Sequence, residues 1–576
     1  METTTTRRSA KYESSIWDDD FVQSLTSPHK VYEKELVEQA EKLKWLVQVM
    51  IDAAEHLSDK LDLIDTLQRL DLSNQFSDAV GRLLDDIFAN YNNQDSNGFI
   101  VLQENLDLHI TALQFRLLRQ HGHHVPQEVF RSFMDEVGNF KESLGGDVKG
   151  MLSLYEASFL CVEGEAILDL AKDFATRHLK KKLEETRNAI LVDEIRHALE
   201  VPLHWRVQKL EARWFIQVYE TRPDANPILV RLAKLNYNMV QAKYQDEIKY
   251  LSRWYKETCL TEKLGFARHR LAEGFLWALG FSPDPEFAFS RRVLCKIAVL
   301  ITVMDDIYDL YGTLDELQAL TDTIQRWDIN GLDKLPEYMQ ISFLALFNSA
   351  NEMAYDVMKD QGLNIISHLR KLWAEMSESF NVEARWYHKR HFPSVDEYLN
   401  LGWISAPGPL VLLYAYLSVV HPIDDDKELA YLQQYPGIIF WPSMVLRLTN
   451  DLATASGEME KGDAPSSMEC YMRETGCSEE EARRHIKQLI EVALKKMNKE
   501  IVMEKGVRNN ENNNYLTEVD HRFCKSAMNL ARIALCVYQF GDGDGMGAPH
   551  GETKRNLISL VVDPIPTPAD DDDATC

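Results

Sequence analysis

The chain has 576 residues, which corresponds to two or three domains of ordinary size. Hydrophobic residues make up 45% of it, and Gly (26) and Pro (19) are scarce, so the composition favours a mostly helical protein with a large core. The formal net charge of −27 argues against nucleic acid and anionic membrane surfaces as partners. An anionic substrate would need cations or metal ions at its binding site.

Nothing in the sequence indicates a membrane or secreted protein. The eight cysteines are scattered without a CxxC pair, which predicts reduced thiols. No run of about 18 apolar residues is present, so we expect no transmembrane helix and no membrane partner. The few residues before Arg7 are too short for a signal or transit peptide. We therefore expect a cytosolic chain or a form whose targeting segment has been removed.

Helical periodicity dominates the chain. Apolar residues recur at helical spacing from 31 to about 219, and the pattern resumes after a Pro-rich joint at 221–227. No alternating strand pattern is visible, so we predict an all-α fold. The predicted organisation is an N-terminal arm (1–30), an N-terminal helical domain (31–222), a C-terminal helical domain (228–560) and an acidic tail (561–576).

The most informative segment is 293–317, in which a nearly continuous apolar helix runs into Asp305, Asp306 and Asp309. Asp305 and Asp309 are four residues apart, so their carboxylates project from one helical face. Like charges at the end of a buried helix are costly unless a cation neutralises them. The alternative is a solvated acidic helix end.

A second segment carries oxygen ligands at helical spacing. Asn450, Thr454 and Glu458 follow one another at intervals of four residues and offer hard oxygen atoms suited to Mg²⁺, or to Mn²⁺ in its place. Alone, this stripe could be an ordinary polar helix face. Together the two helices predict a site in which metal ions surround a diphosphate and neutralise it as a leaving group.

With these motifs the chain resembles plant class I terpene synthases of the monoterpene-producing type over essentially its whole length. DDIYD resembles the aspartate-rich motif of that family, and NDLATASGE resembles its second metal motif. Further matches are the RRx8W arm (Arg7, Arg8, Trp17), the RxR segment (Arg268, Arg270), and the phrases QFRLLRQHG (114–122), LSLYEAS (152–158) and LEARW (210–214).

The resemblance implies two helical domains: a C-terminal class I terpenoid synthase α-bundle that holds the active site, and a catalytically silent, N-terminal α-barrel-like domain. A protonation-initiated enzyme would need a DxDD motif in the N-terminal half, which is absent. It further implies three Mg²⁺ ions, with Mn²⁺ as a substitute. The implied metal ligands are Asp305, Asp309, Asn450, Thr454 and Glu458, with Asp306 in support.

The resemblance also implies the groups that meet the substrate. Arg268 and Arg447 would grip the diphosphate, for which the planar guanidinium fork is suited, and Arg270 would help. Trp277 would face the substrate cavity and stabilise a carbocation with its ring, although plain core packing is the alternative. Tyr538, with Asp542 in a lid loop, would close the cavity. Arg7, Arg8 and Trp17 would lie across the cavity mouth as a cap.

Three departures from the family pattern concern the cavity. Ser466 stands where relatives often carry Lys, which weakens one anion contact and leans the expected product towards an acyclic one. His269 stands where an acidic residue is usual in the RxR segment. The Pro-rich break at 405–409 falls where the family lines its cavity, so the shape of the cavity is expected to differ.

The expected reaction converts geranyl diphosphate to a C10 monoterpene, a hydrocarbon or an alcohol, and inorganic diphosphate, because the RRx8W arm is tied to monoterpene chemistry in relatives. A sesquiterpene synthase that uses farnesyl diphosphate (farnesene or nerolidol type) is the alternative, and a non-catalytic helical scaffold is a remote one. A chain-elongating prenyltransferase would carry a second DDxxD. We expect a monomer or weak homodimer in the plastid stroma, or in the cytosol if Met1 is the natural start. The product does not follow from the sequence.

Overall fold

The structure is a computed structural model that describes residues 7–8, 12–27, 33–91, 107–423, 426–461, 465–506, 520–539 and 550–567. Regular structure within these ranges is helical, and extended pairing there is limited to one isolated bridge between Met134 and Phe140. The prediction of an all-α fold is confirmed.

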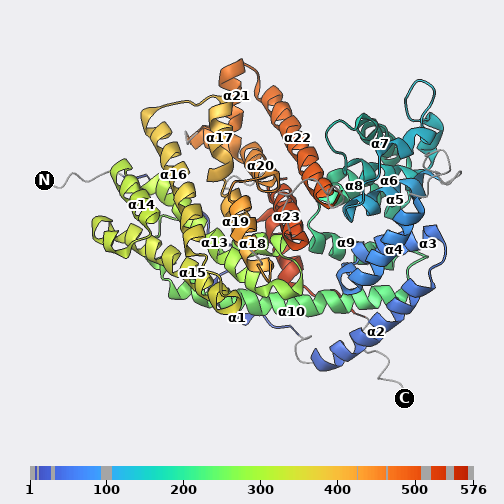
Figure 1. Ribbon diagram of the computed structural model, residues 1–576, viewed down its shortest axis with the longest axis horizontal. Helices are drawn as coiled ribbons and strands as arrows, with labels where there is room; N and C mark the ends of the chain where they lie inside the picture. The colour runs from blue at the N-terminus through green and yellow to red at the C-terminus, as the bar shows by residue number, and fades with distance from the viewer. Residues whose placement is uncertain are drawn as a thin grey trace. The chain divides into compact units, whose positions relative to one another are not determined.

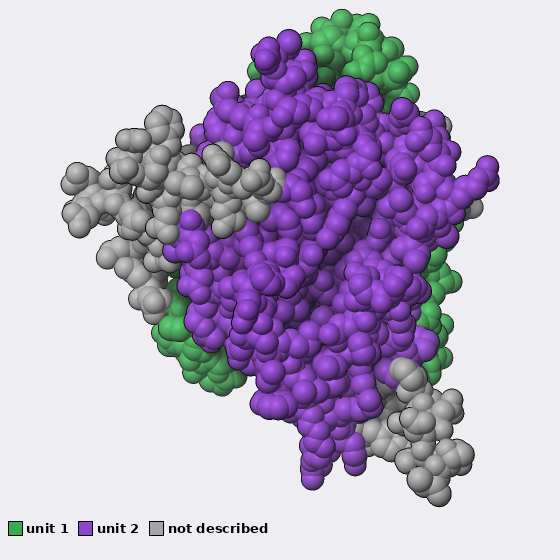
Figure 2. All heavy atoms as spheres, turned by 90° about the vertical axis from the view of Figure 1, so that its right-hand side faces the viewer, with its two compact units in different colours: residues 1–27, 241–494, 517–563 green, residues 28–240, 495–516, 564–576 purple. Residues whose placement is uncertain are grey.

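The chain divides into two compact units (Figure 2). Unit 1 comprises residues 1–27, 241–494 and 517–563, and unit 2 comprises residues 28–240, 495–516 and 564–576. The Pro-rich joint at 221–227 connects two helices, α9 (Gln208–Glu220) and α10 (Pro227–Glu257). The division between the units lies after this joint, between residues 240 and 241 of α10, so this helix continues from one unit into the other.

Unit 2 is a set of helices (Figure 1), and their buried apolar side chains form one core. Helix α5 packs against α6 and α3, and α6 packs against α7. Besides α9 and the start of α10, the α-helices are α2 (Glu33–Ala53), α3 (Leu57–Arg69), α4 (Ser77–Tyr91), α5 (Leu108–Gln120), α6 (Val148–Ser158), α7 (Ala166–Glu185) and α8 (Ala189–Glu200).

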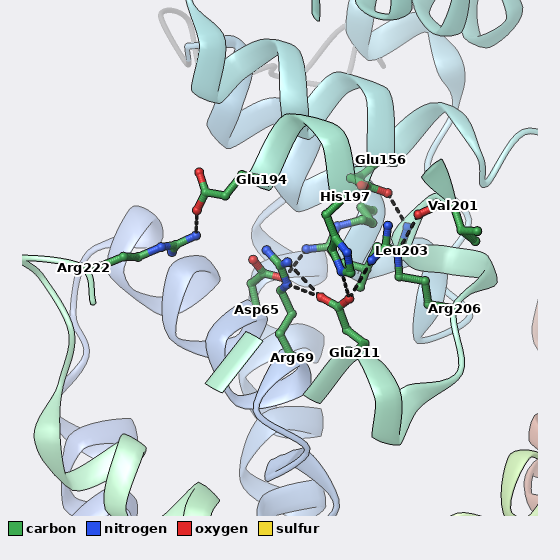
Figure 3. Close-up of polar contacts among 11 residues, drawn as sticks. Asp65, Arg69, Glu156, Glu194, His197, Val201, Leu203, Arg206, Glu211 and Arg222 are labelled. Atoms are coloured by element: carbon green, nitrogen blue, oxygen red, sulfur yellow. Dashed lines mark hydrogen bonds and ion pairs between the residues drawn. The ribbon is translucent and has the colours of Figure 1, made fainter. Parts of the chain in front are cut away.

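A buried carboxylate, Glu211 of α9, lies at the centre of a polar network in unit 2 (Figure 3). Its Oε1 accepts a hydrogen bond from Arg69 Nη2 at 2.8 Å. Its Oε2 accepts one from Arg206 Nη1 at 3.2 Å and lies 2.7 Å from His197 Nε2. Burial alone would raise the pKa of Glu211, but the charge of Arg69 and the bond to His197 outweigh it and lower the pKa. The network ties α3, α8 and α9 together.

Unit 1 holds the rest of α10 and the remaining helices, of which α22 continues into unit 2 after residue 494, and several of them surround one cavity. Helix α12 packs against α13 and α23, α13 against α18, and α20 against α18 and α23. The longer helices are α12 (Leu271–Phe281), α13 (Ala288–Asp306), α14 (Leu314–Arg326), α15 (Glu337–Gln361), α16 (Ile366–Lys389), α17 (Val395–Ser405), α18 (Gly408–Val419), α20 (Gly437–Lys461), α21 (Ser467–Thr475), α22 (Glu479–Gly506) and α23 (His521–Tyr538). The shorter ones are α1 (Asp19–Ser24), α11 (Leu260–Lys263), α19 (Asp426–Leu432) and α24 (Gly551–Leu557).

The stretch 395–419 is long and apolar enough to cross a membrane by length and composition. In the structure it consists of α17 and α18 with a break between them, and 78% of its most apolar window is buried inside the protein. Its hydrophobicity is therefore accounted for by the core of unit 1.

Part of the predicted tail is ordered. A π-helical turn, η10 (Ile558–Val562), leads into Ile565, which is 2% exposed. The Ile565 backbone accepts a hydrogen bond from Asn238 Nδ2 at 2.9 Å and donates one to Asn238 Oδ1 at 2.8 Å. The predicted tail therefore contributes core contacts up to this point, and residues 568–576 lie outside the described ranges.

The network of unit 2 predicts a pH dependence of stability. Burial raises the pKa of Glu156 to about 7 from 4.5, while its Oε2 accepts a hydrogen bond from the Leu203 N–H at 2.7 Å. Because the folded pKa lies above the unfolded one, the stability that Glu156 contributes is complete below the unfolded pKa and is lost as the pH rises through the folded pKa. Gln at this position keeps the acceptor and does not titrate.

We therefore expect the unfolding free energy of the wild type to fall relative to that of Glu156→Gln between about pH 5 and pH 8, by up to ~3 kcal/mol. Urea unfolding of both proteins over this range measures the difference. A difference that stays constant with pH would contradict the assignment.

Candidate active site

A cavity of about 250 Å³ lies inside unit 1, among α12, α13, α16, α17, α18, α20 and α23. Its apolar wall includes Trp277, Phe281, Leu294, Ala298, Ile301, Phe380, Val411, Leu446, Leu530 and Tyr538. Its polar groups include Tyr12, Arg268, Asp305, Asp306, Asp309, Glu383, Arg447, Asn450 and Thr454. An apolar chain and an anionic head group could both be accommodated there.

The aspartate-rich segment spans a change of helix type. Asp305 lies in the last turn of α13, and Asp309 lies in the π-helical turn η7 (Ile307–Tyr311), where the Gly312 N–H donates to the Ile307 carbonyl at 2.8 Å. Such π turns are frequent at functional sites. Both carboxylates line the cavity, in agreement with the spacing argument.

A third carboxylate joins them from another helix. Glu383 of α16 lines the same cavity, and its Oε1 accepts a hydrogen bond from Ser405 Oγ at 2.7 Å. Burial raises the pKa of Glu383 to about 7. Burial also raises the pKa of Asp305, and raises that of Asp309 well above its usual range with the help of the charges on Asp305 and Glu383. Such a cluster fits a cation.

The second ligand helix, α20, lines the cavity with Asn450 and Thr454. The Thr454 hydroxyl donates to the Asn450 carbonyl at 3.0 Å, and Asn450 Oδ1 accepts a hydrogen bond from Arg447. Glu458 lies in the same helix, but its side chain is outside what the structure describes. Asp451, which follows Asn450, is fully buried and accepts from Tyr398 Oη at 2.9 Å.

The donor set suits a metal that shares its coordination with the substrate. Within the described ranges, no three His, Cys, Asp or Glu side chains meet closely enough to hold a metal ion by themselves. The cavity does combine carboxylate, amide and hydroxyl oxygens, which are the donors that Mg²⁺ takes, and Mg²⁺ commonly completes its coordination with water and phosphate oxygens. The residues present therefore fit Mg²⁺ bound together with a diphosphate.

Two of the three predicted diphosphate-binding arginines line the cavity. Arg268 Nε donates to Asp306 Oδ1 at 2.9 Å, its backbone N–H donates to Asp306 Oδ2 at 2.6 Å, and its Nη2 bonds Asp305. Arg447 Nη2 lies 2.5 Å from Asp451 Oδ1. Each guanidinium thus lies beside a predicted metal-binding segment.

Arg270 is placed differently. It is fully buried, it is absent from the cavity lining as described, and its Nη1 donates to the backbone carbonyl of Glu13 at 2.7 Å. Its contact with the diphosphate stays a prediction, and the contact described for its guanidinium is with the N-terminal arm.

The predicted aromatic pair faces the cavity. The rings of Trp277 and Tyr538 lie 5.7 Å apart at 58°, and both line the cavity. Their π faces can stabilise positive charge. Asp542, predicted to belong to a lid loop, lies outside the described residues.

The arginine pair of the N-terminal arm contacts the region that follows Asp309. Arg7 donates to Glu316 Oε1 at 2.7 Å and Oε2 at 2.8 Å, and Arg8 donates to the Asp309 carbonyl at 3.1 Å. Both arginines border a second cavity of about 270 Å³, which shares Asp309, Leu310 and Glu383 with the first.

Trp17, in contrast, packs against Phe21 with ring centroids 5.4 Å apart, and it lines neither cavity as described. The arm reaches the first cavity through Tyr12, which the sequence motif does not single out. The Tyr12 hydroxyl donates to Asp306 Oδ1 at 3.0 Å.

The departures in sequence also have structural outcomes. Ser466 is the N-cap residue of α21, where its hydroxyl accepts from the Glu469 N–H at 3.4 Å, and it is buried. The Pro-rich break at 405–409 does line the cavity, through Ser405, Ala406 and Pro407. His269 Nδ1 lies 2.5 Å from Tyr255 Oη, and burial lowers the pKa of His269.

Comparisons with known proteins agree with this geometry. The profile described as "Terpene synthase, N-terminal domain" matches residues 16–199, and that described as "Terpene synthase family, metal binding domain" matches 256–496. Similar curated proteins include trans-alpha-bergamotene synthase of Phyla dulcis (58% identical, covering 97% of this chain and 99% of the relative), exo-alpha-bergamotene synthase of Lavandula angustifolia (55%, 98% and 99%) and alpha-zingiberene synthase of Ocimum basilicum (52%, 97% and 99%).

Solved structures give the same picture. A limonene synthase with 2-fluorolinalyl diphosphate superposes with a TM-score of 0.90 at 41% identity, covering 97% of this chain and 100% of that one. The isoprene synthase of grey poplar (Populus x canescens), in complex with three Mg²⁺ ions and dimethylallyl-S-thiolodiphosphate, superposes with a TM-score of 0.83 at 43% identity, covering 95% and 99%.

One glycine makes room for an arginine of the site. A Cβ added at Gly402 of α17 would lie 3.0 Å from Arg447 Cδ, so Gly402→Ala must displace the Arg447 side chain. We expect this variant to bind Mg²⁺ and inorganic diphosphate at least about threefold more weakly, a loss typical of a disturbed charge-assisted hydrogen bond. Isothermal titration calorimetry measures the affinity.

Gly81→Ala is the matched control, because a Cβ at Gly81 in α4 meets open space. Wild-type affinity is expected for it. Wild-type affinity of Gly402→Ala for diphosphate would contradict the predicted contact between Arg447 and the anion.

Proposed function

The chain belongs to the terpene synthase family, and from that premise we propose that it is a sesquiterpene synthase that converts farnesyl diphosphate to a C15 product and inorganic diphosphate. The observation that carries the proposal is the identity of 52–58%, over nearly the whole chain, to enzymes named for bergamotenes and zingiberene, which are sesquiterpenes. The limonene synthase, named for a monoterpene, is 41% identical. The preference for geranyl diphosphate drawn from the arm motif therefore gives way to the alternative.

Ionisation of the substrate needs stabilisation of the diphosphate leaving group. Asp305, Asp309 and Glu383 would hold divalent metal on one side of the cavity, and Asn450 and Thr454 would hold it on the other. Bound Mg²⁺, or Mn²⁺ in its place, would supply positive charge to the departing diphosphate. The isoprene synthase complex, with its three Mg²⁺ ions and a prenyl thiolodiphosphate, supports this assignment.

The arginines complete the anion site. Arg268 and Arg447 come from different elements, and both line the cavity beside the candidate metal ligands. A guanidinium offers paired N–H donors with a fixed geometry, which suits phosphate oxygens. We assign both residues to the diphosphate, and Arg270 to a different task.

The apolar part of the cavity would guide the cation. Aliphatic and aromatic side chains form most of this wall, so a prenyl chain would be folded against it with little water present. Trp277 and Tyr538 would stabilise the positive charge through their ring faces. The carbocation would then cyclise or lose a proton without capture by solvent.

The substrate assignment is tested with the purified enzyme, Mg²⁺ and each prenyl diphosphate in turn. We expect kcat/KM for farnesyl diphosphate to exceed that for geranyl diphosphate by about tenfold or more, a size of discrimination that one extra isoprene unit in an apolar pocket can supply. Gas chromatography should identify C15 hydrocarbons or alcohols. A preference for geranyl diphosphate would overturn the proposal in favour of a monoterpene synthase.

The metal assignment is tested by substitution. Asp305→Asn removes a charged ligand without changing its size, and we expect kcat to fall by about 10²-fold or more. Asp193→Asn, an exposed carboxylate of α8 in unit 2, is the control and should retain full activity. Activity should also disappear in EDTA and return with Mg²⁺. Normal turnover by Asp305→Asn would contradict the assignment.

A further inference from the structure

The N-terminal arm is fastened to the first turn of α12 by two side chains that are fully buried. Arg270 Nη1 donates to the Glu13 carbonyl at 2.7 Å. Within the first turn, Glu273 Oε2 accepts from Ser15 Oγ at 2.7 Å, and its Oε1 accepts from the Ile16 N–H at 3.2 Å. Both Arg270 and Glu273 are 0% exposed. We call these contacts between residues 13–16 and α12 the arm clamp.

Burial of two ionisable side chains requires polar partners in return. A charge removed from water is costly unless hydrogen bonds and opposite charges compensate it. Burial raises the pKa of Glu273, and the bond from Ser15 opposes that shift. The arm thus supplies hydrogen bonds to both side chains, and their burial in turn depends on the arm being in place.

The clamp immediately follows the residue through which the arm enters the cavity. Tyr12 lines the cavity, its hydroxyl donates to Asp306 Oδ1 at 3.0 Å, and the Arg268 guanidinium carbon lies 5.3 Å from its ring centroid. Tyr12 therefore covers Arg268 and contacts the aspartate-rich segment. The position of Tyr12 therefore depends on how firmly the backbone of residues 13–16 is held.

A second attachment joins α1 to α10, and it is more exposed to solvent than the arm clamp. Asp19 of α1 accepts from Ser252 at 2.8 Å and from Lys256 at 2.7 Å, but the Lys256 side chain is 65% exposed. Exposed ion pairs contribute little. At the other end, Arg7 and its partner Glu316 are only partly buried. The buried clamp is thus the attachment that solvent competes with least.

We propose that Arg270 and Glu273 are positioning residues that hold residues 13–16 on α12, and so keep Tyr12 as a wall of the cavity beside Arg268 and Asp306. In this assignment the second arginine of the RxR segment binds the arm rather than the diphosphate. The consequence for chemistry rests on the proposed function: a loosened arm admits water to the carbocation. The structural part of the inference is independent of the substrate.

The clamp is tested first in the protein without substrate, by hydrogen–deuterium exchange of peptides that cover residues 12–24. Glu273→Met removes both acceptors with little change of volume, and we expect exchange in this segment to be about tenfold faster or more. Ser15→Ala, on the arm itself, removes one donor and should give a smaller increase. Glu273→Gln keeps an acceptor for the Ile16 N–H and should largely restore the wild-type rate.

Glu247→Met is the matched control. Glu247 is a buried carboxylate of α10 in the same unit, and it pairs with Arg291 of α13 at 2.7 Å instead of with residues 13–16. Its loss should lower the melting temperature without faster exchange in residues 12–24. Folded Glu273→Met and Ser15→Ala proteins with wild-type exchange in this segment would overturn the proposal.

The second readout is the product. In Glu273→Met and Arg270→Met, we expect the ratio of terpene alcohol to hydrocarbon to rise about threefold or more, while the KM for the prenyl diphosphate stays within about twofold, because the diphosphate contacts remain. A tenfold rise of KM in Arg270→Met, with unchanged hydrogen–deuterium exchange in residues 12–24, would overturn the proposal and indicate that Arg270 binds the diphosphate. If farnesyl diphosphate is not turned over at all, the proposed function fails, but the exchange result still decides the clamp.

Discussion

The burial of several carboxylates in one cavity is the constraint on which the site depends. Burial raises the pKa of Asp305, Asp309 and Glu383, and the charge of Asp305 raises the pKa of the other two further, while Arg268 and Arg447 offset these shifts only in part. Without a cation such an arrangement is costly, so its presence is best understood as preparation for metal and diphosphate. The π-helical turn after α13, the pairing of Arg268 with Asp306 and the entry of Tyr12 all adjoin these carboxylates.

Three of the family sequence motifs lie in unit 2 and contribute to its fold instead of to the cavity. Glu211 belongs to LEARW, Glu156 to LSLYEAS and Arg116 to QFRLLRQHG, and none of them lines a described cavity of unit 1. Glu211 and Glu156 belong to the polar network that joins α3, α6, α8 and α9, and Arg116 pairs with Asp65 of α3. The charged residues of these motifs therefore stabilise the fold of unit 2, because a buried charge is costly without a partner.

The sequence predicted the all-α fold and most of the polar side chains that line the cavity. Helical spacing places Asn450 with Thr454, and it places Asp305 near Asp309 even though η7 departs from α-helical geometry. Glu383 and Tyr12 were missed, because each reaches the cavity from a separate segment and carries no motif. Such residues are brought to a site by tertiary packing, which local periodicity does not describe.

The position of Arg270 did not follow from the sequence motif. The RxR segment precedes α12 in irregular backbone, where the direction of a side chain does not follow from a helical period, and the structure places Arg270 against the arm instead of in the cavity. The substrate preference did not follow from a motif either. The arm motif predicted the C10 substrate geranyl diphosphate, while the similarity of the whole chain to its relatives favours the C15 substrate farnesyl diphosphate.

In the proposed function, the carboxylates on one side of the cavity and the oxygen ligands of α20 hold divalent metal jointly with a diphosphate. Counting bound Mn²⁺ by electron paramagnetic resonance, with and without inorganic diphosphate, tests it most directly. Because no three acidic, His or Cys side chains among the described residues meet closely enough to hold a metal alone, we expect weak binding without diphosphate and tight binding of more than one ion with it. Equal binding in both conditions, or no binding in either, would contradict the account.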